Sequence, residues 1–414
     1  MADTQTLAFK TRIHLSNKQR SKFRHWSNAR RYAYNWALSM TNLFRDQDHD
    51  NRLDLTFISQ VDKWFNAGKR PLHHVLKTKS EPSVGSGVHT WLTGIPGSVC
   101  QQAIKYDLKG AWVRFFKGLA RPPHFQNRFR RKSFTLSVQD IKGSHIEGNY
   151  VKLPAKLGRA RLGDACPNKF EKGKLKHTSF TEHGGKWYVS FCLEIPSEEY
   201  YQKCEHTIDA IGVDLGVTQF ASLSTGEHAP FPKEALKRVQ RRIDKLRRSH
   251  KRCEKDSIKY KKTIEQIAKL MARQLHMREN AAHQLTNQLA KTTGLVILED
   301  LDTKNLTKSA AGTIESPGTN VKAKSGLNRE ILNMGWYRVR SQLQYKTEKF
   351  GCLLTTVPPQ YTSQECSECH YTHADNRLSQ AVFKCQKCGH SENADINAAK
   401  NIREKGLKKV AGAG

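Results

Sequence analysis

Four cysteines in the last sixty residues of this 414-residue chain have the spacing of a metal site. Two residues separate Cys366 from Cys369 and Cys385 from Cys388, and fifteen residues lie between the pairs. A two-residue gap lets a knuckle turn aim both sulfurs at one ion, and four thiolates satisfy the tetrahedral preference of Zn²⁺. Because four protein thiolates leave no open coordination position, we expect a structural zinc ion and not a catalytic one.

Three acidic residues, far apart in the sequence, form a second candidate site. Asp214 lies in the apolar run GVDLGV, where a carboxylate is costly unless it meets a metal ion or a cation. Glu299 ends the run LVILE, and Asp395 opens an alanine-rich helical segment. Carboxylates at strand ends and a helix start can converge on two Mg²⁺ ions, or Mn²⁺, for phosphodiester hydrolysis. Taken singly, Glu299 also fits an edge carboxylate, and Asp395 fits a helix N-cap.

The charge of the chain indicates a polyanionic partner. Lysine and arginine total 70 against 38 acidic residues, a net charge of +32 that is spread over the whole sequence. A net charge of roughly 2 to 8 is enough for solubility, and phosphate contacts release condensed counterions, so nucleic acid is the expected partner. Within residues 121–134, cations alternate with three phenylalanines, a pattern suited to a phosphate backbone with stacking contacts, with candidates Arg128, Arg130 and Arg131.

The first residues, MADTQT, show neither a basic stretch nor an apolar run of the kind that forms a signal peptide. We therefore expect a cytoplasmic protein of a prokaryotic cell that does not enter a membrane. Cysteines in that compartment serve as thiols or metal ligands, not as disulfides. Six of the ten cysteines are scattered singly, and we interpret them as packing residues: Cys100, Cys166, Cys192, Cys204, Cys253 and Cys352.

The first half of the chain alternates between strand and helix patterns. Residues 7–15 alternate apolar and polar side chains like a strand, and Ser16 is placed to cap a basic amphipathic helix that runs to about residue 39. A second helical stretch is expected at 98–119. Short alternating runs between about 133 and 200 predict a small β-barrel or sandwich, which the strand at 7–15 could complete.

A new domain is expected to begin shortly before Asp214. A strongly charged stretch at 232–292 predicts a helical hairpin, and an apolar strand then leads to Glu299. Residues 304–326 contain few core-forming side chains, so we expect a mobile lid there, with a helix near 327–348.

Taken together, these segments resemble the TnpB family of transposon-encoded nucleases, relatives of the miniature type V CRISPR effectors. The matching pieces occur in the family's order and are GVDLGV, VILEDL, YTSQECSEC, CQKCGH and NADINAAKNI. The resemblance covers nearly the whole chain and is specific from about residue 206 onward. It favours Glu299 over the neighbouring Asp300 as the second acidic residue. His370 departs from the family pattern, because a glycine is usual after the first knuckle.

The resemblance implies a multidomain α+β protein with an RNase H-like RuvC nuclease domain. The implied parts are a β-barrel wedge domain (1–16 and 121–205), a helical recognition domain (17–120), a RuvC-like domain (206–360 and 391–405) with hairpin 232–292 and lid 304–326, a zinc ribbon (361–390) and a tail (406–414).

The resemblance also implies an RNA-guided DNA endonuclease that binds a guide RNA and double-stranded target DNA, and we expect one protein chain per complex. Asp214, Glu299 and Asp395 would then be catalytic. By position in the helical module, Gln101, Gln102 and Lys105 are candidates for reading a short DNA motif beside the target. The alternatives are an RNA-guided DNA-binding repressor and a DNA transposase or resolvase with an RNase H-like site.

Overall fold

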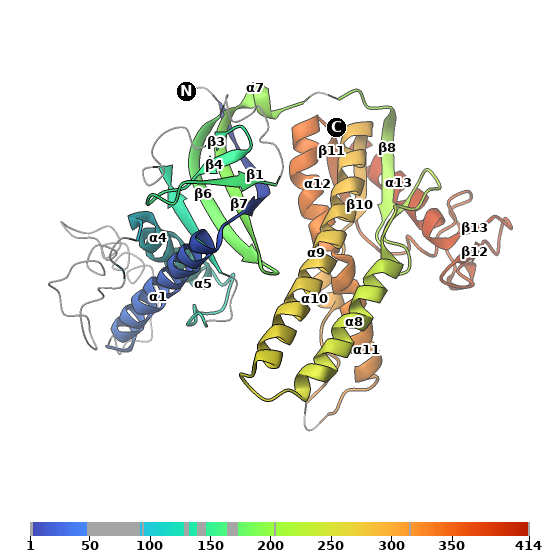
Figure 1. Cartoon of the computed structure of the whole chain (residues 1–414). Helices are drawn as coiled ribbons and strands as arrows, with labels where there is room; N and C mark the ends of the chain where they lie inside the picture. Colours follow the sequence, from blue (N-terminus) through green and yellow to red (C-terminus); the bar gives the residue numbers. More distant parts are fainter. Residues whose placement is uncertain are drawn as a thin grey trace. The chain divides into compact units, whose positions relative to one another are not determined.

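A computed structural model describes residues 3–47, 92, 95–127, 132–138, 146–163, 173–202, 204–313 and 316–412. The chain forms two compact units, Met1–Ser197 and Glu198–Gly414, each with its own sheet and helices (Figure 1). The protein is thus a mixed α/β, multidomain chain. Within the described residues, no helix is both long enough and apolar enough to cross a membrane.

The first unit contains a seven-stranded sheet built around the N-terminal strand. β1 (Thr4–His14) pairs antiparallel with β7 (Lys186–Pro196) on one side and with β5 (Arg159–Leu162) on the other. The strand expected at 7–15 is therefore confirmed, and it joins strands that follow it by more than 140 residues. The full order is β2 (Ser133–Ser137), β6 (Lys174–His183), β7, β1, β5, β4 (Tyr150–Lys152) and β3 (Ile146–Glu147).

The prediction of a closed β-barrel is not borne out in this sheet. Within the described part of the first unit, β2 and β3 are edge strands that do not pair with each other. The alternating pattern predicts a strand with one buried face, but closure depends on strand tilt and on edge length. Here β3 is two residues long and β4 three, so this edge is too short to extend the hydrogen bonding.

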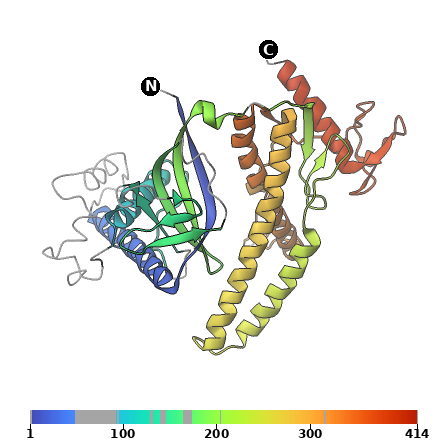
Figure 2. The same ribbon diagram turned by 45° about the horizontal axis from the view of Figure 1, so that its top comes forward.

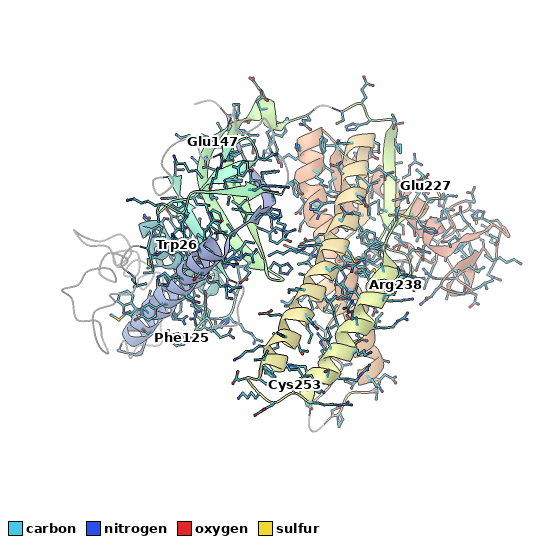
Figure 3. The ribbon with its side chains drawn as sticks, in the orientation of Figure 1. Trp26, Phe125, Glu147, Glu227, Arg238 and Cys253 are labelled. Carbon is cyan, nitrogen blue, oxygen red and sulfur yellow. The ribbon has the colours of Figure 1, made fainter. Side chains whose placement is uncertain are left out.

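Helix α1 (Asn17–Gln47) follows β1 and packs its apolar face on this sheet (Figures 1 and 3). Ser16 caps it as expected: its hydroxyl accepts from Gln19 N at 3.3 Å, and Gln19 Oε1 accepts from Ser16 N at 2.9 Å. This reciprocal pair is a capping box. Phe23 and Trp26 are fully buried, with their ring centroids 5.7 Å apart.

The second helical stretch of the first unit is confirmed, with an irregular middle. α4 (Gly97–Gln101) continues into a π-helix (Gln102–Leu108) and then α5 (Lys109–Phe116). The π-helix packs against α1, where Arg30 Nη2 and Asp107 Oδ2 form an ion pair of 2.5 Å. All these helices lie between β1 and β2 in the sequence, so the helical segment is an insertion into the sheet.

The second unit is built on a four-stranded sheet in the order β11–β10–β8–β9. β8 (Ile208–Asp214), β10 (Thr293–Glu299) and β11 (Leu353–Val357) are parallel, whereas the short β9 (Ser222–Leu223) is antiparallel to β8. Parallel strands end at the same edge of a sheet, so the carboxyl ends of β8 and β10 lie side by side.

Helices cover both faces of this sheet (Figure 2). Ile211 and Val296 face the core shared with α9 (Ile258–Thr292) and α12 (Trp336–Phe350). Ala210, Leu295 and Ile297 face the opposite way, toward Ile402 of α13 (Ala394–Ala411). Because side chains alternate along a strand, each strand contributes to both cores.

The predicted helical hairpin is present as α8 (Lys233–Lys251) and α9. The turn between them contains Cys253, labelled in Figure 3, and Ser257 caps α9 by accepting from Tyr260 N at 3.1 Å. The chain reverses where the run RSHKRCEKDS predicts it, because the apolar spacing is interrupted there.

The prediction of a mobile lid at 304–326 is wrong for residues 321–326, which are helical. A short helix, α10 (Thr303–Leu306), is followed by a loop, and α11 (Val321–Met334) begins six residues before the expected helix start at 327. The expected helix at 327–348 is divided, because Gly335 adopts a left-handed conformation with φ 74° between α11 and α12. Residues 321–326, VKAKSG, concealed the helix, since they contain one large apolar side chain and give no apolar periodicity.

Candidate active site and metal centre

The four cysteines gather at one point, as their spacing predicts. Their sulfur atoms all lie within 4.8 Å of one another, with Cys366 Sγ 3.7 Å from Cys388 Sγ and Cys369 Sγ 3.5 Å from Cys385 Sγ. A tetrahedral ion with Zn–S bonds of about 2.3 Å needs sulfurs roughly 3.8 Å apart. The cluster therefore fits a structural metal such as zinc. Four protein ligands leave no open coordination position at which such an ion could take part in catalysis.

Two turns aim these sulfurs. His370 N donates to Cys366 O at 2.9 Å, and Gly389 N donates to Cys385 O at 3.1 Å. His370 and Gly389 both have left-handed backbones, with φ of 58° and 75°. His370 thus adopts the glycine conformation of the family pattern despite its side chain, whose nitrogens lie 3.5 Å from Glu365 and 3.4 Å from Glu404.

The protonation of the cysteines is uneven. Burial raises the pKa of Cys366 to about 12. Although burial opposes it, the backbone N–H groups of Cys388 and Lys387 lower the pKa of Cys385 to about 6. A thiolate is the form that ligates metals, so the lowered pKa of Cys385 favours binding of an ion, whereas the raised pKa of Cys366 opposes it.

The three candidate carboxylates lie on one face of the second sheet. Asp214 is the last residue of β8 and Glu299 the last of β10, and the preceding pair, Val213 and Leu298, are in register. By strand alternation, Asp214 and Glu299 share the face of Ala210 and Ile297, which is the face that α13 covers. Asp395 is the second residue of α13, so the helix supplies the third carboxylate to the same face.

The neighbouring Asp300 lies apart from this group. It is exposed, and its Oδ1 accepts from Arg340 Nη1 of α12 at 2.6 Å. Side chains alternate along the strand, so Glu299 lies on the face of the other two carboxylates and Asp300 does not. The family resemblance also favoured Glu299.

Electrostatics couple the three carboxylates. Burial raises the pKa of Asp214 to about 7, with further contributions from the charges of Glu299 and Asp395 and an opposing one from Arg377. Burial also raises the pKa of Glu299, against the hydrogen bond from Thr362 and the charges of Lys405 and Arg377. Buried carboxylates that repel one another favour a cation between them.

Thr362 and Arg377 are functional candidates that the sequence did not reveal. Thr362 Oγ1 donates to Glu299 Oε1 at 2.5 Å, which fixes that carboxylate. Arg377 Nη2 donates to Asp395 Oδ1 at 3.1 Å and to Gln380 O at 3.4 Å. Arg377 lies between the two cysteine pairs, and a single arginine in so basic a chain gives no signal before its place in the fold is known.

Helix α13 is clamped to the cysteine segment. Asn397 Oδ1 accepts from Ser367 N at 3.0 Å, and its Nδ2 donates to Glu365 O at 2.8 Å. Asn401 Nδ2 donates to Thr362 O at 2.9 Å and to Glu365 O at 2.7 Å. Both asparagines are fully buried, so the segment before Cys366 and the helix that carries Asp395 form one packed structure.

Small residues bring α13 close to the sheet. A Cβ at Gly212 would lie 2.1 Å from Ala399 O and 2.5 Å from Arg403 N, so only glycine fits there. Gly406 similarly faces Ile297. Asn393 caps the helix by accepting from Asp395 N at 3.0 Å, which leaves the Asp395 carboxylate for the site instead of the cap. The N-cap interpretation of Asp395 is therefore wrong.

The candidate nucleic-acid residues lie in the first unit. Gln101, Gln102 and Lys105 are half-buried at the junction of α4 and the π-helix, and the Lys105 ammonium lies 6.0 Å from the Tyr106 ring centroid. Their role stays a prediction. The other three candidates lie outside the described residues: Arg128, Arg130 and Arg131.

Three family models match the chain in succession. Residues 1–43 match a "Helix-turn-helix domain", residues 190–310 a "Probable transposase", and residues 336–402 a "Cas12f1-like, TNB domain". The last match contains the cysteine cluster, Arg377 and Asp395, and the second contains Asp214 and Glu299.

Relatives match over most of the chain. A protein of Escherichia coli (strain K12) named "Putative RNA-guided DNA endonuclease InsQ" is 33% identical over 395 residues, covering 95% of this chain and 91% of that protein. A "Putative RNA-guided DNA endonuclease" of Streptomyces pristinaespiralis is 26% identical, covering 77% and 73%. Among solved structures, a Cas12f1 chain in a complex with single-guide RNA and target DNA aligns with a TM-score of 0.45 and 14% identity, covering 97% and 99%.

Proposed function

Because the chain belongs to the TnpB/IS605 family, we propose that it is an RNA-guided, Mg²⁺-dependent DNA endonuclease. The E. coli relative that carries this activity in its name aligns with nearly the whole of both chains. The net charge of +32 suits a protein that holds a guide RNA and double-stranded target DNA together.

The observation that carries the proposal is the convergence of Asp214, Glu299 and Asp395 on one face of the sheet. Burial and mutual repulsion raise the pKa of Asp214 to about 7, and a divalent cation would relieve both effects. Carboxylate oxygens are the ligands that Mg²⁺ and Mn²⁺ prefer, so these three residues would hold the ions. When bound there, the ions supply Lewis-acid stabilisation of the charge that develops at the scissile phosphate.

The other side chains of the site have supporting roles in this mechanism. Thr362 orients Glu299, and the clamp from Asn397 and Asn401 holds α13, and with it Asp395, against the cysteine segment. Arg377 neutralises Asp395 in the absence of ions, and its guanidinium is placed to hold a phosphate of the strand beside the carboxylates.

We also propose how the chain is divided into domains. The sheet β11–β10–β8–β9 and helices α8, α9 and α13 would form a RuvC-like nuclease domain with a zinc ribbon at 361–390. The bounds expected for this domain, 206–360 and 391–405, end too early, because α13 continues to Ala411 through most of the expected tail (406–414). The open sheet of the first unit would be the wedge domain (1–16 and 121–205). Its inserted helices (17–120) would be the recognition domain, with Gln101, Gln102 and Lys105 as contacts to DNA.

The test is guided cleavage by wild type and four variants. The protein is expressed with its flanking genomic DNA, the copurifying RNA is sequenced, and Mg²⁺-dependent cutting of a matched target is measured. We expect Asp214→Asn, Glu299→Gln and Asp395→Asn to lose cutting by about 10³-fold or more, because each removes a metal ligand. The matched control Asp300→Asn removes an adjacent carboxylate outside the site and should cut normally.

Equal cutting by Glu299→Gln and Asp300→Asn would contradict the assignment of the second carboxylate. Binding of guide-matched DNA by wild type without any cutting would instead indicate an RNA-guided repressor. Cutting or strand transfer that does not depend on RNA would indicate a transposase or resolvase.

A further inference from the structure

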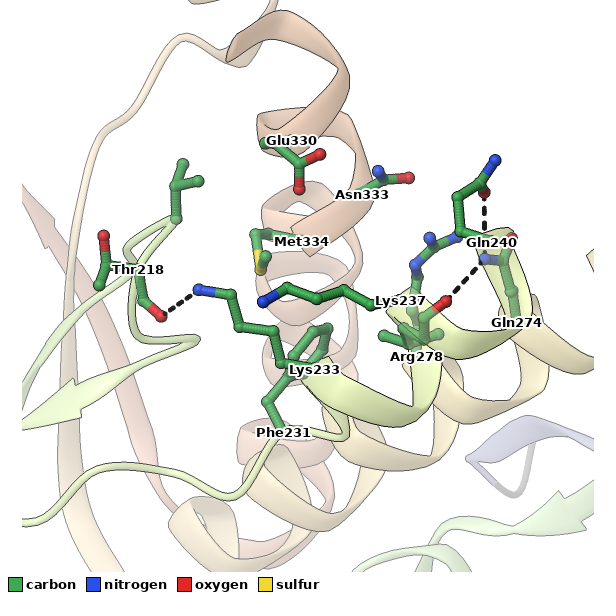
Figure 4. Close-up of a pocket in the computed structure, with 12 residues that line it drawn as sticks. Thr218, Phe231, Lys233, Lys237, Gln240, Gln274, Arg278, Glu330, Asn333 and Met334 are labelled. Carbon is green, nitrogen blue, oxygen red and sulfur yellow. Dashed lines mark hydrogen bonds between the residues drawn. The ribbon is translucent and has the colours of Figure 1, made fainter. Parts of the chain in front are cut away.

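A pocket of about 310 Å³ opens in the second unit between α8, α9 and α11 (Figure 4). Lys233 and Lys237 enter it from α8 and Arg278 from α9, whereas Glu330 of α11 is its one acidic side chain. Lys237 Nζ also pairs with Glu234 Oε1 on the same helix at 2.8 Å, so three cations face two carboxylates, and the remaining positive charge makes the pocket attractive to an anion.

The cations of the pocket have hydrogen-bonding capacity to spare. Lys233 Nζ donates to Thr218 O at 3.0 Å, which uses one of the three ammonium protons. Arg278 Nε is buried and has no hydrogen-bond partner among the described residues. Burial and the nearby charge of Arg338 lower the pKa of Arg278, so its charge is held at a cost that an anion would offset.

The remaining walls are apolar or firmly held. Phe231 and Met334 line one side, as Figure 4 shows, and give a surface for a flat or apolar group. Gln274 is buried and donates to Leu236 O and to Gln240 Oε1, both at 3.2 Å. These bonds tie α8 to α9, so the cations project from a fixed frame.

The rim of the pocket connects to the candidate active site. Thr218 follows Asp214 by four residues, which limits the separation of their Cα atoms to about 14 Å. Thr218 Oγ1 also donates to Gln380 Oε1 at 3.3 Å. Gln380 O in turn accepts from Arg377, the residue that contacts Asp395.

We propose that this pocket binds one nucleotide of the DNA strand that enters the acidic site. Lys237, Lys233 and Arg278 hold its phosphate, and Phe231 and Met334 contact its sugar and base. The inference rests on the proposed nuclease function and adds a subsite that is separate from the metal-binding carboxylates.

The position of the pocket favours the cut strand over the guide RNA. The loop that leaves Asp214 forms the rim, so a strand that runs from the carboxylates over the carboxyl-terminal edge of the sheet reaches the pocket within a few nucleotides. An anchored nucleotide on one side of the scissile bond fixes the register of the strand, which is how remote binding groups raise the rate of the chemical step.

The test combines substitution of single cations of the pocket with neutralisation of single phosphates of the DNA, as in a double-mutant cycle. Guide-matched DNA is prepared with one neutral methylphosphonate linkage at successive positions around the cut, and single-turnover cutting by the full RNA complex is measured. In wild type, neutralising one non-scissile linkage should slow cutting about tenfold. In Lys237→Gln, cutting should already be about tenfold slower, and the same linkage should then have no further effect, since one contact is lost only once.

Lys245→Gln is the matched control, because Lys245 is exposed on the same helix and does not line the pocket. It should behave as wild type at every linkage. Arg278→Gln should repeat the result for Lys237→Gln. If its thermal unfolding shows that it does not fold, the exposed Lys237 carries the test alone.

If Lys237→Gln and neutralisation of each linkage slowed cutting additively, the pocket proposal would be overturned, whereas the proposed nuclease function would stand. Loss of copurifying guide RNA from Lys237→Gln, with normal phosphate sensitivity, would also overturn it and assign the pocket to RNA. The proposed function fails by a different result, which is the absence of guided cutting in wild type or its persistence in Asp214→Asn.

Discussion

Arg377 Nη2 lies 3.1 Å from Asp395 Oδ1, so an arginine held between the two cysteine pairs contacts the acidic residue that begins α13. The structural metal centre and the candidate catalytic site are therefore parts of one assembly. Changes to one should be measurable in the other.

Replacing Arg377 by alanine should slow guided cutting about 100-fold, because loss of one charged donor at a developing phosphate charge has an effect of this size. Binding of guide RNA should be unchanged, since the side chain faces the carboxylates. Single-turnover cutting and RNA retention measure the two effects. The control Lys384→Ala removes an exposed cation of the same segment and should cut normally; equal losses in both variants would mean that general charge matters and not this contact.

Removing the structural metal should abolish cutting, although none of its ligands touches the carboxylates. In Cys385→Ser, the content of bound zinc should fall from one ion per chain, and the melting temperature should drop by several degrees, since structural zinc contributes folding free energy directly. Metal analysis and thermal unfolding check this. Cys204→Ser alters a cysteine outside the cluster and should keep its zinc, and full cutting by zinc-free protein would refute the coupling.

Asp214→Asn should stabilise the metal-free protein at pH 8. The pKa of Asp214 rises from 3.8 to about 7 on folding, so ionisation of this carboxyl group destabilises the folded protein. This destabilisation is absent below about pH 4, grows as the pH rises, and reaches its full size above pH 7. Each unit of pKa shift corresponds to about 1.4 kcal/mol, so the gain at pH 8 should be on the order of 2 to 4 kcal/mol. Denaturant unfolding at pH 4 and pH 8 measures it. An equal gain in unfolding free energy at pH 4 and pH 8 would show that charge is not the cause. With saturating Mg²⁺, the wild type should become more stable than Asp214→Asn.

Gly212→Ala should weaken both the fold and the site. The new methyl group would meet Ala399 O at 2.1 Å, and overpacking of this kind costs about 1 to 3 kcal/mol and displaces the helix that carries Asp395. The control Gly326→Ala places its methyl in open space within α11 and should stabilise the protein by about 0.5 to 1 kcal/mol. Chemical denaturation and guided cutting of both variants test this, and a neutral Gly212→Ala would show that β8 and α13 can separate.

The sequence predicted those features whose signal is local. Two cysteine pairs of fixed spacing predicted the metal cluster, and the apolar face of α1, with Phe23 and Trp26, was evident from its 3.6-residue period. The strand patterns also placed Glu299 at a strand end, whereas Asp214, expected inside an apolar run, is the last residue of β8. The choice of Glu299 over Asp300 required the family resemblance, and the structure gives the physical reason, because alternation turns Asp300 toward Arg340.

The features that were missed depend on contacts between distant segments. Arg377 is recognised as a site residue only by its contact with Asp395, and Thr362 only by its contact with Glu299. No local sequence pattern connects either pair. The open form of the first sheet could not be predicted either, because alternation along a strand carries no information about which edge strands meet. The early start of α11 was hidden because its first six residues, VKAKSG, lack an apolar periodicity.

The close approach of α13 to β8 at Gly212 has a consequence for the order in which the protein is made. Residues 394–411 leave the ribosome after every strand on which they pack, about 180 residues later than Asp214. A nascent chain therefore displays two of the three carboxylates on an uncovered sheet face, and contacts of such long sequence separation form slowly. In the proposed mechanism, nuclease competence therefore depends on the late docking of this helix, and we expect the growing polypeptide to stay inert toward the surrounding DNA until then.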